Sequence, residues 1–227
     1  HTIELIKITE GEERIVFTGA EIFGTTPALL PSVPKEGLKI EFLGDSITAG
    51  YGNLAPATEK LFYTFQQDST RAYAYICASL LGADAHYECI SGKGVYFNCN
   101  GVKDYEIPTF FTHASRETRE PWDFTAWTPD VVVINAGTND YCGKVEDKTF
   151  TEAAVDFLKL VRSKYPKALI IWAYGMMQTC AYNAIEEAVN TFADDNARFV
   201  KIRSMYEYQD EIGGNGHPNE KCHRRVG

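Results

Sequence analysis

The sequence predicts an α/β fold built on a five-stranded parallel sheet, and two observations carry this prediction. From residue 38 onward, strand-like segments alternate with helix-like segments, which is the pattern of consecutive βαβ units. Residues 131–135 and 168–173 are nearly continuous apolar runs, as is typical of strands that helices cover on both faces. The length of 227 residues allows one such core with a small appendage but not two full domains.

The expected strands cover residues 38–43, 85–90, 131–135, 168–173 and 198–202. Residues 71–81 fit a helix or a strand by pattern, and their length and the following Gly82 favour a helix. A further helix is expected to begin at a capping box from Thr149 to Glu152, because apolar residues recur at helical spacing after it. The same spacing predicts a helix over residues 185–192.

The N-terminal region has a different pattern. Residues 2–9 and 14–18 read as two short strands separated by a turn, which predicts a β-hairpin. An isolated hairpin is marginally stable, so we expect it to pack on the main domain or to belong to a β-domain whose beginning has been cut away. The proline-rich residues 25–34 read as an extended linker. The chain begins with histidine and shows no leader, so we expect a processed or excised piece.

Composition excludes several classes of protein. Apolar residues make up 44% of the chain and aromatic residues 13%, which is too many for a disordered protein. The net charge of −9 makes nucleic acid and anionic membranes poor partners, and no apolar run is long enough to span a bilayer. The six cysteines have no Cys-x-x-Cys spacing for zinc, and they favour a secreted protein with one to three disulfides of open connectivity.

Polar residues gather where the predicted strands end, which is where ligands bind in a parallel sheet. They lie at residues 44–48, 91–94 and 137–140, and a last glycine-rich loop covers residues 213–219. Taken singly, each has an ordinary structural interpretation as a helix cap, a turn residue or an exposed loop histidine. Together they indicate a nucleophile, Ser46, at a strand-to-helix turn, and a base, His217. The backbone N–H groups of Ser46 and Gly92 and the side-chain amide of Asn139 would hold an oxyanion.

These blocks, Gly-Asp-Ser-Ile-Thr, Ser-Gly, Gly-Thr-Asn-Asp and His-Pro in this order, resemble the SGNH (GDSL) hydrolase superfamily over residues 38–227. Its four named residues would be Ser46, Gly92, Asn139 and His217. The resemblance implies a flavodoxin-like three-layer sandwich.

Within the superfamily, the blocks and the N-terminal hairpin are most similar to carbohydrate esterase family 2, whose members place a β-sandwich before the SGNH domain and remove acetyl groups from polysaccharides such as xylan. Residues 1–20 would then be the last strands of a truncated β-sandwich, residues 21–37 a linker, and residues 38–227 the catalytic domain. The resemblance implies a secreted, monomeric serine esterase that acts on acetylated polysaccharide or oligosaccharide, without a metal or other cofactor. A general or lipase-like carboxylesterase and a non-catalytic carbohydrate-binding domain are the alternatives.

One position departs from the superfamily pattern. Most SGNH hydrolases have an aspartate three residues before the histidine, and this chain has Gly214 there. A triad carboxylate orients the imidazole and stabilises its charged form. Either His217 works with Ser46 as a dyad, with a backbone carbonyl accepting from the imidazole, or Asp210 or Glu211 takes the place of the acid. We prefer the dyad.

Two further groups of residues carry interpretations of their own. Asp45 and Asp140 lie beside candidate site residues, and we interpret both as structural. Aromatic residues on loops at the active end of the sheet are candidates for stacking on sugar rings, although core packing explains any one of them equally well. These candidates are Tyr51, Trp122, Trp127 and Tyr141.

Overall fold

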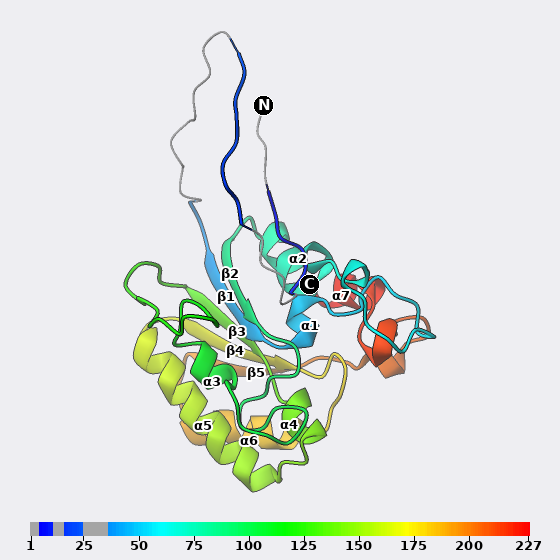
Figure 1. Ribbon diagram of the computed structural model, residues 1–227. Coiled ribbons are helices and arrows are strands. Elements are labelled where there is room, and N and C mark those ends of the chain that lie inside the picture. The colour runs from blue at the N-terminus through cyan, green and yellow to red at the C-terminus, as the bar shows by residue number, and fades with distance from the viewer. Residues whose placement is uncertain (1–4, 11–15, 25–35) are drawn as a thin grey trace.

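The computed structural model of the protein describes residues 5–10, 16–24 and 36–227. Its centre is one parallel sheet in the order β2-β1-β3-β4-β5 (Figure 1). The strands are β1 (Lys39–Gly44), β2 (Asp84–Cys89), β3 (Val131–Asn135), β4 (Leu169–Tyr174) and β5 (Ala197–Lys201). The predicted strands, the parallel sheet and the flavodoxin-like order are confirmed, because each strand begins and ends within one residue of its expected position.

Helices cover both faces of the sheet and make three layers (Figure 1). The helices are α1 (Ser46–Ala49), α2 (Tyr73–Leu80), α3 (Ile107–Phe110), α4 (Thr138–Cys142), α5 (Asp147–Lys164), α6 (Tyr182–Phe192) and α7 (Glu220–Val226). Helices α1, α2 and α7 lie on one face, and α5 and α6 lie on the other. The helices expected from the patterns at 71–81 and 185–192 are confirmed as α2 and α6.

The alternation of side chains along β1 explains why both faces carry a core. Ile40 and Phe42 pack with Tyr73 of α2, whereas Leu43 joins the larger cluster under α5 and α6. Successive side chains of a strand point to opposite faces, so a strand covered on both sides must be apolar at consecutive positions. This is the physical basis of the apolar runs that predicted β3 and β4.

The predicted N-cap of α5, Thr149, is wrong by three residues. The helix begins at Asp147 with Glu146 as N-cap, and no side chain caps its first N–H groups. Asp147 in the first turn is favourably placed against the positive end of the helix, and its carboxylate accepts a 2.7 Å hydrogen bond from the Tyr141 hydroxyl. These contacts begin the helix before Thr149, whose capping-box position therefore lies inside it.

The long insertion between β2 and β3 carries one short helix, α3, and contributes to the core. Ile107 and Phe111 are fully buried beneath α5. At its end, the Asp130 N–H donates to the Lys39 carbonyl at the amino end of β1. The insertion therefore starts at the carboxyl edge of the sheet and finishes at the amino edge.

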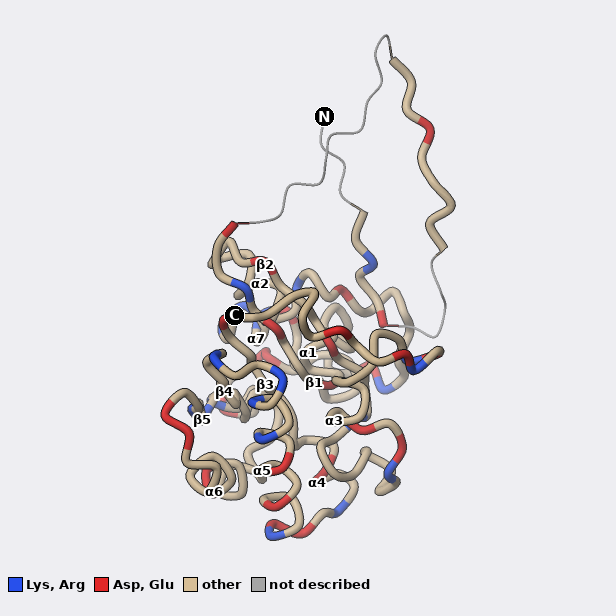
Figure 2. The backbone as a smooth tube through the Cα atoms, turned by 90° about the vertical axis from the view of Figure 1, so that its left-hand side faces the viewer, with Lys and Arg blue, Asp and Glu red and all other residues tan. Residues whose placement is uncertain are grey.

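The predicted N-terminal hairpin is not present over its described residues, because residues 5–10 and 16–24 contain no strand. The rest of the hairpin and most of the linker lie outside the described residues. Figures 1 and 2 show residues 16–24 projecting from the α/β body, and Val16 and Phe23 are 75% and 87% exposed. Without a sheet to cover these side chains, two short strands gain little from pairing. The domain boundaries remain a prediction.

The six cysteines all lie in the described part of the chain, and all are free. The expected disulfides are therefore absent. The cysteines are distributed over separate elements of the fold, among them α2, the end of β2, α4 and α7.

Within the ranges that the structure describes, no helix is both long and apolar enough to cross a bilayer. Figure 2 shows basic and acidic residues interspersed along the backbone of the described part of the chain.

Candidate active site

Ser46 lies at the turn between β1 and α1, at the carboxyl end of the sheet. It is the first residue of α1, and only 6% of it is exposed. Asp45 caps this short helix, because its Oδ1 accepts a 2.9 Å hydrogen bond from the Ile47 N–H. The predicted role of Asp45 in holding the turn is confirmed. A hydroxyl at such a turn projects from the sheet edge, where a reacting group can approach it.

His217 reaches Ser46 from the loop before α7. Its Nε2 lies 3.0 Å from the Ser46 Oγ, across 171 residues of sequence. The structure therefore brings together the two residues that the sequence singled out as nucleophile and base. The distance is that of a hydrogen bond in which a hydroxyl donates to a neutral imidazole.

A backbone carbonyl orients the imidazole. The Nδ1 of His217 lies 3.2 Å from the Asn215 carbonyl oxygen. Because a carbonyl only accepts, Nδ1 carries the proton and Nε2 is left as the acceptor for the Ser46 hydroxyl. Asn215 adopts a left-handed conformation with φ of 51°, which asparagine tolerates better than most residues and which turns its carbonyl back toward His217.

Neither alternative acid takes this place. The Asp210 carboxylate pairs with Lys221 Nζ at 2.8 Å, and the Glu211 carboxylate pairs with Arg225 at 2.7 Å. Burial alone would raise the pKa of Glu211, but the hydrogen bonds and charge of Arg225 outweigh it and hold that pKa below its usual value. Both carboxylates are committed to cations, so the arrangement of groups is the dyad that the sequence favoured.

Packing explains why the superfamily's aspartate has no counterpart here. A Cβ atom at Gly214 would lie 2.6 Å from the Ala55 Cβ, closer than two carbon atoms can approach. Gly214 also accepts the His217 N–H through its carbonyl and donates its own N–H to the Gly52 carbonyl. The glycine therefore lets the histidine loop lie against residues 52–55.

Burial keeps His217 neutral. The loss of water around the ring lowers its pKa below the usual 6.5, and the hydrogen bond to the Asn215 carbonyl offsets only part of this effect. At neutral pH the imidazole is therefore in the form that accepts a proton.

Two backbone N–H groups are available near the Ser46 hydroxyl. Those of Ser46 and Gly92 have no acceptor among the residues that the structure describes. Gly92 has a φ of 80°, and a Cβ there would lie 3.3 Å from the Cys99 Sγ. A side chain at this position would be both strained and crowded, so glycine suits a backbone that presents its N–H.

The third predicted oxyanion donor is engaged elsewhere in this structure. The Asn139 Nδ2 donates to the Asp45 Oδ2 at 3.0 Å and to the Lys93 carbonyl at 2.8 Å. An amide nitrogen has two hydrogens, so both are in use in this structure, and the role of Asn139 as an oxyanion donor stays a prediction. The buried acceptors Asp45 and Lys93 satisfy the amide in the absence of an oxyanion, and they link the loops that follow β1, β2 and β3.

Two buried carboxylates support these loops. Asp140 accepts the N–H groups of Val95, Tyr96 and Phe97 at 2.6–3.0 Å, which fixes the start of the insertion and confirms its structural role. Burial raises the pKa of Asp45 to about 7.

Sequence reasoning missed the role of Asn215, although a glycine-rich loop with an asparagine was a signal for a left-handed residue.

Of the four aromatic candidates, the structure places only Tyr51 beside the catalytic pair. Its ring centroid lies 4.5 Å from that of His217, and its other neighbour is Phe62 at 3.9 Å. Tyr141 lies on α4, but its side chain packs on Phe150 and bonds Asp147, so it anchors α5.

The two tryptophan predictions are wrong in location. The Trp127 Nε1 donates to Asp84 at the amino end of β2, and its ring stacks on His86 at 3.8 Å. The ring centroid of Trp122 lies 6.1 Å from the ring centroid of the same histidine. A residue shortly before a parallel strand must lie at the amino edge of the sheet, and Trp127 precedes β3 by only four residues. The site lies at the opposite edge.

The fold and the site together define a class of protein. A 2-1-3-4-5 parallel sheet carries a serine at the turn after its first strand and an imidazole from the C-terminal loop in contact with it. The N–H groups of Ser46 and Gly92, which follow β1 and β2, have no acceptor in the described part of the chain. This is the serine-hydrolase type of site on a flavodoxin-like SGNH fold. The chain belongs to the GDSL-like lipase/acylhydrolase family, whose profile matches residues 42–225.

Similar proteins agree with this assignment. The cellulase/esterase CelE of Acetivibrio thermocellus is 37% identical over 99% of this chain, which spans only 28% of CelE. An acetylxylan esterase / glucomannan deacetylase of Cellvibrio japonicus is 32% identical over 65% of this chain and 41% of its own length.

The solved structures show the same similarity. A family two carbohydrate esterase from Clostridium thermocellum in complex with cellohexaose matches with a TM-score of 0.80 at 31% identity, covering 87% of this chain and 63% of the other. The acetyl xylan esterase Est2A from Butyrivibrio proteoclasticus matches with a TM-score of 0.78 at 25% identity, covering 86% and 62%. The chain therefore spans less than two thirds of these relatives.

Proposed function

We propose that this protein is a serine esterase that removes O-acetyl groups from plant cell-wall polysaccharide, such as xylan or a related hemicellulose. The observation that carries the proposal is the contact between the Ser46 Oγ and the His217 Nε2 at 3.0 Å, with the other ring nitrogen held by a carbonyl. The names of the relatives, a cellulase/esterase and an acetylxylan esterase / glucomannan deacetylase, support the choice of substrate.

The proposed reaction has two halves. His217 accepts the proton of Ser46 as the Oγ attacks the acetyl carbonyl, and the N–H groups of Ser46 and Gly92 hold the oxyanion. The imidazolium returns its proton to the departing sugar hydroxyl, which leaves an acetyl-serine. Water then attacks the acetyl carbon while His217 accepts its proton, and the imidazolium returns that proton to the Ser46 Oγ as acetate leaves. Asn139 becomes a third donor if the oxyanion draws one amide hydrogen away from Asp45 or Lys93.

The missing carboxylate has a defined consequence in this mechanism. The Asn215 carbonyl sets the imidazole tautomer, but it lacks the full negative charge that stabilises an imidazolium. Burial of His217 adds to this cost, because it lowers the ring's pKa. The proposed enzyme therefore relies on orientation and on its N–H donors more than on a charged triad.

The deciding experiment compares acetate release from acetylated xylan by the chain and by its Ser46→Ala variant. We expect release that the variant abolishes. Turnover of p-nitrophenyl acetate and longer acyl esters without release from xylan would favour a general carboxylesterase. Absence of turnover of either substrate would contradict the proposal, and glycan binding without turnover would then support a carbohydrate-binding domain.

Because a polymeric cell-wall substrate lies outside the cell, we also propose that the protein acts extracellularly, as a monomer. Each copy contains both Ser46 and His217, so no second chain is needed to complete the pair. Fractionation of the producing culture would test the location, and light scattering would test the assembly.

A further inference from the structure

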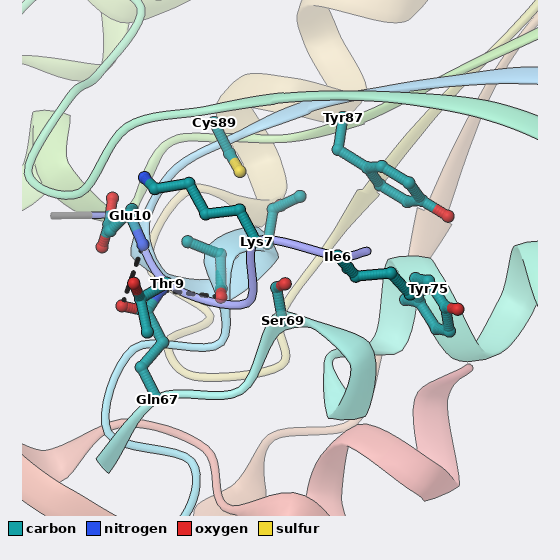
Figure 3. Close-up of a pocket in the computed structure, with 11 residues that line it drawn as sticks. Ile6, Lys7, Thr9, Glu10, Gln67, Ser69, Tyr75, Tyr87 and Cys89 are labelled. Carbon is teal, nitrogen blue, oxygen red and sulfur yellow. Dashed lines mark hydrogen bonds between the residues drawn. The ribbon is translucent and has the colours of Figure 1, made fainter. Parts of the chain in front are cut away.

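Residues 5–10, here called the N-terminal strap, cross the body of the protein close to the candidate site. The Ile8 carbonyl accepts the Ser69 N–H at 2.9 Å, and the Glu10 N–H donates to the Gln67 Oε1 at 3.3 Å. Figure 3 shows the strap between β2, which carries Tyr87 and Cys89, and the segment that carries Gln67 and Ser69. These bonds join the strap to the segment just before α2.

The Glu10 side chain reaches the loop that carries Gly92. Its Oε2 accepts the Ser91 N–H at 2.8 Å, and its Oε1 accepts the Ser91 hydroxyl. Both carboxylate oxygens of Glu10 thus accept hydrogen bonds from Ser91, the residue immediately before the predicted oxyanion donor Gly92. Hydrogen bonds to a charged acceptor are stronger than those to a neutral one.

The same strap is linked to the helix of the nucleophile. Gln67, which is 1% exposed, donates its Nε2 to the Ala49 carbonyl at the end of α1 at 2.8 Å. Figure 3 shows this bond and the bond from Glu10 to Gln67 as two consecutive dashed lines. Ser46 is the first residue of α1, so the strap connects the helix that bears Ser46 with the loop that bears Gly92.

Hydrogen bonds matter here because the strap is not tightly packed. A pocket of about 300 Å³ lies beside it, lined by strap residues and by Thr48, Ala49, Tyr75, Tyr87 and Cys89. The strap side chains Leu5, Ile6 and Ile8 are 75%, 40% and 39% exposed, so apolar packing restrains the strap only partly. The contacts of Glu10 and Gln67 hold it instead.

We infer that Glu10 is a positioning residue, which holds Ser91 by its N–H and its hydroxyl and so sets the direction of the adjoining Gly92 N–H toward the oxyanion. Gly92 has no side chain to limit its rotation and adopts a φ of 80°, so its amide direction depends on its neighbour. A carboxylate that binds both the N–H and the hydroxyl of Ser91 supplies that restraint. The inference rests on the proposed esterase function for its kinetic consequence, but not for its structural one.

The charge of Glu10 would by itself oppose a nearby oxyanion, which allows positioning to be distinguished from electrostatics. If orientation dominates, Glu10→Ala lowers kcat, and Glu10→Gln restores part of it because an amide oxygen still accepts one bond. If the charge were the only effect, both variants would raise kcat. The sign of the change therefore decides between the two.

The experiment measures kcat and KM for p-nitrophenyl acetate on the whole chain. Removing an oxyanion donor costs roughly 10²–10³-fold in kcat, so misdirecting one should cost about tenfold. We expect that loss for Glu10→Ala with KM changed less than about twofold, a smaller loss for Glu10→Gln, and none for the matched control Glu21→Ala, whose residue lies exposed on the projecting segment. In a double-mutant cycle, Ser91→Ala should remove only part of the effect of Glu10→Ala, because it deletes the hydroxyl bond and keeps the backbone N–H bond.

A second measurement does not depend on turnover. In NMR spectra, Glu10→Ala should accelerate hydrogen exchange of the Ser91 amide and shift the Gly92 amide resonance, and Glu21→Ala should do neither. Unchanged Ser91 exchange, or an unchanged or raised kcat in Glu10→Ala, would overturn the inference. If the wild-type chain hydrolyses no ester while the amides respond as expected, the proposed function fails and the positioning role of Glu10 stands.

Discussion

The Nδ1 of His217 lies 3.2 Å from the Asn215 carbonyl oxygen, so a backbone group occupies the place that a carboxylate takes in a serine triad. The two residues are separated by a single glycine, which makes this contact local to one loop. The imidazole is therefore oriented by the conformation of its own loop and not by a distant acid.

Introducing the missing acid should not improve the enzyme. In Gly214→Asp the new Cβ would lie 2.6 Å from Ala55, so the histidine loop has to move. We expect kcat/KM for acetyl esters to fall about tenfold or more, because small displacements of catalytic groups are costly. The smaller Gly214→Ala should lose activity as well, because its Cβ makes the same clash. A rise in kcat/KM for Gly214→Asp would show that the loop readily accommodates a carboxylate.

The left-handed conformation of Asn215 gives a second prediction. Asn215→Gly should keep nearly full activity, because glycine adopts a φ of 51° without strain and supplies the same carbonyl. Asn215→Val should reduce kcat and destabilise the protein by about 1–3 kcal/mol, because a β-branched residue is strained there. Steady-state kinetics and thermal unfolding of the two variants would test this. Equal loss in both would show that the asparagine side chain, and not the carbonyl, is needed.

The pH profile should reflect the burial of His217. Burial lowers the pKa of this imidazole below 6.5, and only the neutral form accepts the serine proton. Activity should therefore be complete at neutral pH and fall as pH drops through a midpoint below 6.5. The measurement is kcat/KM from pH 4 to 8, corrected for reversible unfolding. A midpoint above 6.5 would mean that a carboxylate stabilises the imidazolium after all.

Acid should destabilise the fold through His223. This side chain is fully buried and accepts the Tyr73 N–H at 3.1 Å, and burial, helped by the charge of His217, lowers its pKa to about 3. The unfolded chain binds a proton near pH 6.5, so the stabilisation is complete above that pH and is lost as pH falls from 6.5 toward 3. The loss is about 1.4 kcal/mol per pH unit.

Thermal unfolding of His223→Asn tests this contribution, because asparagine can still accept from Tyr73 but does not titrate. Between pH 7 and pH 5 the melting temperature of the wild type should fall more than that of the variant, by a few degrees for a chain of this size. Parallel curves for the two proteins would place the acid sensitivity in other groups.

The buried pair of Glu211 and Arg225 should be important for stability. The side chain of Glu211 is 2% exposed and that of Arg225 is 25% exposed. Arg225→Met leaves a buried carboxylate without its cation and should cost about 3–5 kcal/mol of the free energy of unfolding. The double variant Glu211→Gln with Arg225→Met should recover a large part of that loss. Chemical denaturation of the three proteins would test both statements, and strictly additive losses would contradict them.

Most of the fold was predictable because strands covered on both faces leave a clear mark in the sequence. β3 and β4 are apolar at consecutive positions, and β1 and β5 were recognised from their place in the alternation. The helix start at Asp147 was not predictable, because it depends on a hydrogen bond from Tyr141. The expected hairpin strands were also not found over residues 5–9 and 16–18, because short-range pattern cannot show whether a neighbouring sheet is present.

The sequence by itself determined the succession of strands and helices along the chain, and it singled out Ser46, Gly92 and His217 as candidate site residues, because the carboxyl ends of parallel strands meet at one edge of the sheet. Tertiary structure alone decided which partner orients His217, that Asn139 already donates both amide hydrogens, and that Glu10 reaches Ser91 across 81 residues. Tertiary structure also places Trp127 at the amino edge of the sheet, and not at the carboxyl edge where the sequence analysis expected it. The physical reason is that hydrogen bonds depend on distances of a few tenths of an ångström, which periodicity and spacing along a chain do not specify.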